Sequence, residues 1–186
     1  MDRRNHNNFI KQVHRRIAQI SVGPSAIRNQ GAAGIVAICR NYFEKSIDLL
    51  EFREIMGSND FNNYLNLHTN NLIALFPENG KSWGAARQGL TLFFREVTYN
   101  FYLANYLSIP TGKEQNNNIL KNLELPLDND VAICLMELFP NLPKWKSIKK
   151  LTAEESDLYQ IAAKDYAKQK NIPRIHLDLE FWRKDR

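Results

Sequence analysis

The sequence has no hydrophobic run long enough to cross a membrane, because no stretch approaches the roughly 20 consecutive apolar residues that a spanning helix needs. Its first residues are charged and are not followed by an uninterrupted apolar segment, so we expect no signal peptide. Only two cysteines are present, Cys39 and Cys134, which excludes a four-cysteine zinc or iron–sulfur site. Both lie in apolar surroundings. We expect buried thiols in a cytoplasmic protein, with a single disulfide as the alternative.

Several catalytic motifs are also missing. The four histidines show neither the HExxH pattern nor a paired spacing with cysteine, which argues against a zinc hydrolase. The GxSxG motif, the phosphate-binding glycine-rich loop and the GxGxxG motif are all absent. The sequence therefore gives no support for α/β-hydrolase, P-loop or Rossmann chemistry.

The composition is that of a folded protein. Of the 186 residues, 44% are apolar and 24% are charged, which fits one compact domain spanning residues 1–186. Apolar residues recur every three or four positions along nearly the whole chain, as at Phe9, Val13 and Ile17, whereas the alternation typical of strands is almost absent. The sequence therefore predicts an all-α fold.

Two helices are predicted in some detail. The longest helical signal includes Leu90 and Ala104 and is expected to end near Ser108, just before a proline and a glycine. Another helix is expected to begin at Thr152, because the segment from Thr152 to Glu155 has the pattern of a capping box. The inner face of this second helix is expected to contain Leu158, Ile161, Ala162 and Tyr166.

A carboxylate at the start of an apolar helix is the first candidate for catalysis. It is Asp128 in the segment LPLDNDVA, two residues after Pro126. The segment resembles the Pro-x-Asp sequence that holds the catalytic aspartate of the helix–hairpin–helix DNA glycosylases. Aspartate is also a preferred N-cap residue, so the alternative is that Asp128 only caps the helix.

The C-terminal segment NIPRIHLDLEFW supports the same resemblance. It is similar to the Ile-Pro-x-Leu-His-Ile-Asp-x-x-x-Trp ending of the archaeal 8-oxoguanine branch of that superfamily, with matches at Ile172, Pro173, His176, Asp178 and Trp182. In that branch the aspartate and the tryptophan line the pocket for the flipped base. A spacing of four residues puts Asp178 and Trp182 on one face of a helix. The alternative is that Trp182 packs on the core and Asp178 caps the last helix.

The helix between these two motifs lacks the lysine that attacks the sugar in bifunctional members of the superfamily. The corresponding position is Gln88, or Arg87 if the alignment shifts by one. Neither side chain can form a Schiff base, because an amide nitrogen is not basic and arginine stays protonated. Lys81 lies further away and is a poor substitute. The glycine-rich hairpin is also degraded, so the resemblance spans residues 80–186 and residues 1–79 match only in being helical.

Positive charge is the last feature of interest. The chain has 25 Lys and Arg residues against 20 Asp and Glu residues, giving a formal net charge of +5, and a basic protein of this size often binds nucleic acid. We expect contacts to DNA phosphates from Arg87 and from four lysines in the segment KWKSIKK, the alternative being a solvated surface. These lysines are Lys144, Lys146, Lys149 and Lys150.

Taken together, the resemblance implies a two-lobed helical DNA glycosylase with its base pocket between the lobes. Asp128 would be catalytic, and Asp178, Trp182 and Gln88 would line the base pocket. Without the lysine, the product would be an intact abasic site, and the reaction would need no metal or organic cofactor. The expected partner is double-stranded DNA with one flipped nucleotide, bound by a monomer in the cytoplasm, or on the nucleoid if the protein is prokaryotic.

Two other functions stay open. A glycosylase fold kept only for binding nucleic acid would also show a degraded hairpin and no lysine, and a helical interaction protein could have an incidental basic surface. Oxidised guanine is the substrate that the resemblance implies by default. A different lesion, or a modified base of foreign DNA, is compatible with the change at Gln88.

Overall fold

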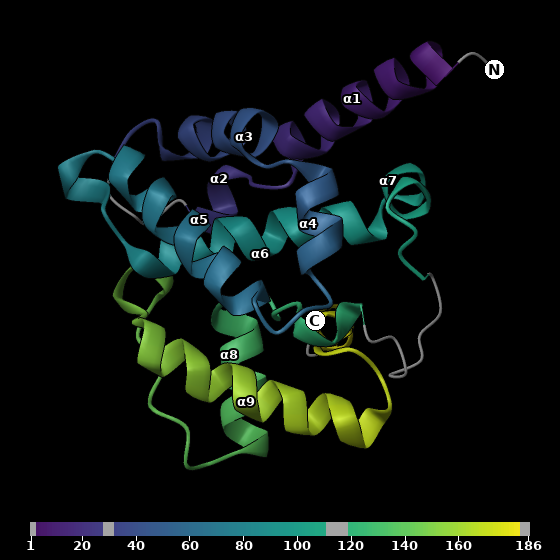
Figure 1. Cartoon of the computed structure of the whole chain (residues 1–186). Helices are drawn as coiled ribbons and strands as arrows, with labels where there is room; N and C mark the ends of the chain where they lie inside the picture. The colour runs from purple at the N-terminus through teal and green to yellow at the C-terminus, as the bar shows by residue number, and fades with distance from the viewer. Residues whose placement is uncertain (1–2, 28–31, 111–118, 183–186) are drawn as a thin grey trace.

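The part of the chain that the structure describes is predominantly helical. The computed structural model describes residues 3–27, 32–110 and 119–182, and within these ranges it contains ten α-helices, a few short 3-10 turns and no strand (Figure 1). The predicted all-α class is confirmed. In chain order the α-helices are α1 (Arg3–Ile20), α2 (Pro24–Ile27), α3 (Ile35–Ser46), α4 (Leu49–Ile55), α5 (Phe61–Leu75), α6 (Trp83–Tyr99), α7 (Phe101–Tyr106), α8 (Asn129–Leu138), α9 (Ala153–Lys170) and α10 (Leu177–Phe181).

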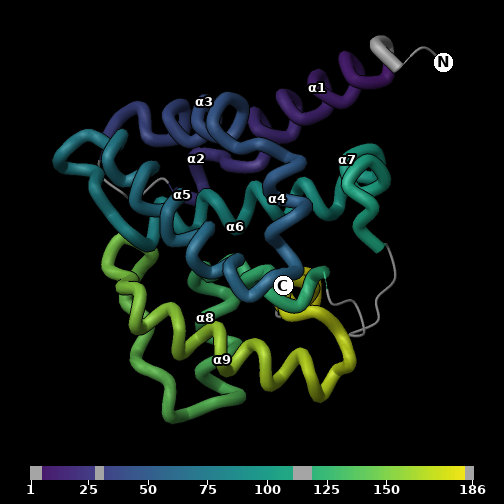
Figure 2. Tube along the Cα trace, viewed as in Figure 1, coloured from purple at the N-terminus to yellow at the C-terminus, as the bar shows by residue number. Residues whose placement is uncertain are grey.

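Helix α6 crosses the centre of the molecule, with α3 above it and α8 and α9 below it in the view of Figures 1 and 2. Ser82 is its N-cap: the Ser82 Oγ accepts a hydrogen bond from the backbone N–H of Ala85 at 3.1 Å. Most of the helix is buried, including Leu90, Phe93 and Val97, because neighbouring helices cover it on several sides. Within the described ranges, no helix is both long and apolar enough to span a membrane.

The helix predicted to run to Ser108 is interrupted at Asn100. The Asn100 side chain accepts hydrogen bonds from the backbone N–H groups of Tyr102 and Leu103, both at 3.1 Å, so it caps a new helix, α7. The change of direction takes Phe101 out of the core, and 68% of its surface is exposed. The prediction of one continuous helix was therefore wrong, because a local cap overrides the apolar spacing.

Buried apolar side chains form two clusters. The main cluster joins helices α1 to α7 and includes the stacked ring pairs Phe43–Phe93 and Phe52–Phe94, with centroids 4.8 and 4.3 Å apart. The second cluster joins α8, α9, α10 and the residues just before α8, and it includes Leu125, Leu135, Tyr159 and Phe181.

The two cysteines lie in different clusters. Cys39 is in the main cluster and Cys134 in the second, and neither is in a disulfide. Burial raises the pKa of the Cys39 thiol to about 12, which keeps it protonated at neutral pH. The prediction of two buried thiols is confirmed.

Helix α9 begins as predicted, but only part of its predicted inner face is buried: Ala162 is buried and Tyr166 is half-buried, whereas two other predicted residues are exposed. Thr152 Oγ1 accepts a hydrogen bond from the backbone N–H of Glu155 at 3.2 Å, as expected for an N-cap. Leu158 and Ile161, however, are 50% and 58% exposed. The buried face is built on Tyr159 and on alanines, which let α9 approach its neighbours closely.

Glycine is required at one close contact, which positions the lysine-containing segment 144–150. In the first turn of α6, a Cβ added at Gly84 would lie 2.0 Å from the carbonyl oxygen of Ile148. The neighbouring Ser82 Oγ donates a hydrogen bond to the carbonyl oxygen of Lys149 at 3.2 Å. These contacts hold the 3-10 turn Ile148–Lys150 (η4) against the start of α6.

We expect Gly84→Ala to lower the free energy of unfolding by about 1–3 kcal/mol, because the new methyl group would overlap backbone atoms that cannot move aside. Chemical denaturation measures this change. Gly23→Ala is the matched control, since a Cβ there would have only an ordinary contact of 3.8 Å. Equal stability of the Gly84→Ala and wild-type proteins would contradict the close approach.

Candidate functional site

One cleft collects most of the residues that the sequence singled out. It has a volume of about 780 Å³, and its lining includes Asp128, Asp178, Trp182, Gln88, Lys146 and Lys149. Helices α2 and α6 of the main cluster form one side, and the start of α8, the segment around Trp145 and helix α10 form the other. The two sequence motifs, 50 residues apart in the chain, therefore meet at the same surface.

Asp128 is both the N-cap of α8 and part of the cleft wall. Its Oδ1 accepts a hydrogen bond from the backbone N–H of Val131 at 2.9 Å. Burial raises the pKa of the Asp128 carboxyl above its usual value, although this hydrogen bond and the positive charge of Arg95 act in the opposite direction. The capping role that the sequence left as an alternative is thus present, and it does not remove the carboxylate from the cleft.

The residues just before Asp128 form an irregular segment, 123–127, that two polar side chains hold in place. Gln160 of α9 pairs with the backbone of Leu125: its Oε1 accepts from the Leu125 N–H at 3.0 Å and its Nε2 donates to the Leu125 carbonyl at 2.7 Å. Arg174 donates to the carbonyl oxygens of Leu123 and Asn122, both at 2.9 Å. The sequence analysis missed Gln160 and Arg174, because nothing near them in the chain indicates these partners.

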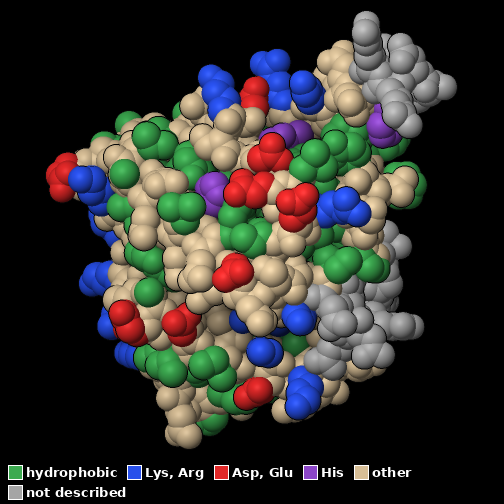
Figure 3. All heavy atoms as spheres, in the orientation of Figure 1, with side chains coloured by type: hydrophobic (Ala, Val, Ile, Leu, Met, Phe, Trp, Pro, Cys, Tyr) green, Lys and Arg blue, Asp and Glu red, His purple; other side chains and the backbone are tan. Residues whose placement is uncertain are grey.

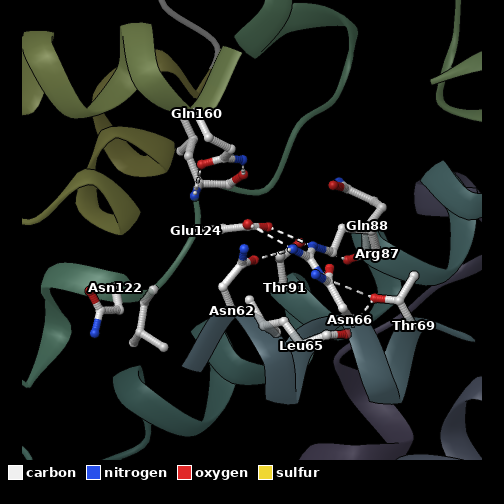
Figure 4. Close-up of polar contacts among 12 residues, drawn as sticks. Asn62, Leu65, Asn66, Thr69, Arg87, Gln88, Thr91, Asn122, Glu124 and Gln160 are labelled. Atoms are coloured by element: carbon white, nitrogen blue, oxygen red, sulfur yellow. Dashed lines mark hydrogen bonds and ion pairs between the residues drawn. The ribbon is translucent and has the colours of Figure 1, made fainter. Parts of the chain in front are cut away.

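Arg87 holds the same segment from the other side, as part of a buried network (Figure 4). Its guanidinium forms two hydrogen bonds to the Glu124 carboxylate, at 2.8 and 3.0 Å, and both side chains are almost fully buried. Its other donors reach Asn62, Asn66 and Thr69 of α5 at 3.1–3.2 Å. The expected contact between Arg87 and DNA is therefore not retained, because the guanidinium is enclosed and already paired.

Asp178 meets a basic partner that the sequence analysis did not identify. Its Oδ2 accepts a hydrogen bond from Arg95 of α6 at 2.6 Å, and Arg95 also pairs with the adjacent Glu96 at 2.6 Å. Arg95 lines the cleft together with Asp178. The only sequence signal is a charged Arg-Glu pair inside the apolar stretch of α6. Asp178 is thus a paired carboxylate in the cleft wall, and Trp182, four residues on, is 67% exposed.

The four predicted phosphate-binding lysines do not all reach the cleft. Lys146 and Lys149 line it together with Trp145, whereas Lys144 and Lys150 are exposed and do not line it. Lys146 also forms an ion pair with Glu155 at 2.9 Å. Lys81, the possible substitute for the missing lysine, pairs with Glu78 at 2.6 Å and does not line the cleft.

Positive charge is not continuous on the face shown in Figure 3. There, Lys and Arg side chains gather along the upper edge, over α1 and α3, and acidic side chains lie near the centre. A bound polyanion would be repelled by that centre. The cleft lining has three basic side chains, Arg95, Lys146 and Lys149, beside the three carboxylates Asp128, Asp130 and Asp178.

In the part of the chain that the structure describes, no group of three or more His, Cys, Asp or Glu side chains is arranged to hold a metal ion. The chain matches no protein-family model, no curated protein and no solved structure.

Proposed function

We propose that the chain is a DNA N-glycosylase, with a two-lobed fold resembling that of the helix–hairpin–helix glycosylases. The two hydrophobic clusters would be the two lobes, and the cleft between them would receive the flipped base. The observation that supports this most strongly is the meeting of both motifs in one cleft, with Asp128 from the first and Asp178 and Trp182 from the second.

Asp128 is suited to stabilise the transition state of base release. Breaking the N-glycosidic bond builds positive charge on the sugar, and a fixed carboxylate nearby lowers the energy of that charge. The N–H of Val131 fixes the orientation of the carboxylate, and partial burial strengthens its field. Asp128 would also orient the attacking water. Apart from this water, the proposed chemistry uses only groups of the chain itself.

The aromatic lining of the cleft fits a base that has left the helical stack. An extruded base loses its neighbours in the duplex and gains stacking contacts in an aromatic pocket. Trp145 and Trp182 both line the cleft. Trp145 is braced by Tyr159, whose ring lies edge-on at 5.7 Å, while Trp182 is largely exposed at the cleft. These two indoles are the proposed stacking surfaces.

The proposed reaction leaves an intact abasic site, because Gln88 stands at the position of the lysine and cannot form a Schiff base. A panel of duplexes, each with one modified base such as 8-oxoguanine, hypoxanthine or uracil, tests the proposal. We expect at least one duplex to break only after hot alkali. Breaks without alkali would show lyase activity, with Lys146 and Lys149 the first lysines to replace. No breaks on any duplex that the protein binds would favour a non-catalytic nucleic-acid-binding protein.

The two lysines in the cleft are expected to contact DNA phosphates. Replacing Lys146 and Lys149 together with Gln should weaken binding to all duplexes alike and reduce the log–log salt slope by about one for each lost contact. Fluorescence anisotropy over a range of salt concentrations measures this slope. The matched control replaces Lys144 and Lys150, which have the same charge but lie outside the cleft. If the two double substitutions reduce DNA affinity equally, the duplex does not bind along the cleft.

A further inference from the structure

Helix α6 presents three side chains to the cleft. Gln88, Leu92 and Arg95 lie four and three residues apart, so they share one face of the helix, and all three line the cleft. Arg95 is paired with Asp178 and Glu96, and Leu92 is apolar. The polar chemistry of this face near the start of α6 therefore depends on Gln88.

Gln88 is a buried residue, and its amide group makes no hydrogen bond to the part of the chain that the structure describes. Only 5% of the residue is exposed. Within residues 3–27, 32–110 and 119–182, the one hydrogen bond of Gln88 besides the backbone bonds of α6 is made by its carbonyl oxygen, which accepts from Thr91 Oγ1 of the same helix at 3.1 Å, and the amide group makes none. Figure 4 shows no hydrogen bond between the Gln88 side chain and the Arg87 network.

A second buried glutamine, Gln160, differs from Gln88 because its amide is hydrogen-bonded. Gln160 is 4% exposed, and both ends of its amide are used in the pairing with Leu125. Buried polar groups in proteins are nearly always hydrogen-bonded, since leaving one unpaired lowers stability. An unpaired amide that borders a cleft is satisfied by solvent or by a ligand that enters the cleft.

We infer that the Gln88 amide recognises the substrate, by hydrogen bonding to an uncharged nucleobase edge that offers a donor beside an acceptor. A primary amide has one acceptor oxygen and an NH₂ donor side by side, which is the arrangement that pairs with such an edge. A phosphate offers only acceptors and an alkyl group offers neither. This inference rests on the proposed function, because it assumes that a base enters the cleft.

The test measures binding in the Asp128→Asn background, which keeps the base attached to the DNA. The probes are duplexes with a single 8-oxoguanine, hypoxanthine or uracil, and the undamaged duplex of the same sequence. We expect at least one modified duplex to bind more tightly than the undamaged one, and Gln88→Met to reduce that preference by about tenfold to 100-fold. Affinity for the undamaged duplex should not change, because phosphate contacts do not involve Gln88.

Thermal unfolding separates recognition from a structural role. Gln88→Met should leave the melting temperature nearly unchanged, because the Gln88 amide makes no hydrogen bond within residues 3–27, 32–110 and 119–182 that the substitution could remove. Gln160→Met is the matched control and should lower it by roughly 4 °C or more, because two buried hydrogen bonds are lost. If Gln88→Met also lowers the melting temperature, the binding test uses Gln88→Glu instead, because Glu has nearly the same size as Gln.

An unchanged preference in a folded Gln88 variant, or no preference for any modified duplex, would overturn the inference. Its failure is distinguishable from that of the proposed function. If the wild type releases a base and Gln88→Met does not change the preference for modified duplexes, the glycosylase proposal still holds. Base preference that depends on Gln88, with no base release, would refute the catalytic proposal alone.

Discussion

Replacing Asp128 with Asn is expected to reduce base release by on the order of 100-fold or more, because the carboxylate charge that stabilises the transition state is lost. Asn is as good an N-cap as Asp, so the start of α8 should stay intact. Burial raises the pKa of Asp128, which means that folding disfavours its ionised form. Removing the charge should therefore not lower the free energy of unfolding. Single-turnover kinetics and chemical denaturation measure the two quantities.

Asp128→Ala is the control that separates the cap from the chemistry. It removes the charge and also the hydrogen bond to the Val131 N–H, so it should lower the free energy of unfolding by about 0.5–2 kcal/mol in addition to the loss of activity. DNA binding should be equal or tighter in Asp128→Asn, because a negative charge near the phosphates is gone. Full activity in a folded Asp128→Asn protein would reduce Asp128 to a helix cap.

Replacing Arg87 with Met is expected to lower the free energy of unfolding by about 3–5 kcal/mol, because it leaves the Glu124 carboxylate buried without its partner. The paired change Arg87→Met with Glu124→Gln should recover much of this loss, since no unpaired charge is then buried. Denaturation curves of the two single variants and the double variant measure the coupling. If the Arg87→Met protein is stable but binds DNA more weakly, the result would instead support the contact between Arg87 and a DNA phosphate that the sequence predicts.

Features that depend on nearby residues could be predicted from the sequence. The cap at Thr152 and the cap at Asp128 involve backbone groups three residues away, and both are present. The same local physics explains one error. The apolar spacing continues across Asn100, so it gives no sign that the Asn100 side chain caps a new helix there.

Features that depend on distant partners could not be predicted. Burial of Arg87 requires Glu124, which is 37 residues away, and Arg95 meets Asp178 across 83 residues. Nothing in the local pattern distinguishes such arginines from exposed ones. The sequence motifs pointed to Asp128, Asp178 and Trp182 as site residues. Only the fold shows that these three share a cleft with Arg95 and Trp145.

Release of a free base is the most direct test of the proposed activity. DNA containing oxidised, deaminated and alkylated bases is incubated with the protein, and the ultrafiltrate is analysed by mass spectrometry, so the target base need not be known in advance. We predict that one free base accumulates with time in the wild-type reaction and stays at background level with Asp128→Asn. The absence of any released base with wild-type protein that binds the DNA, or equal release by both proteins, would contradict the account.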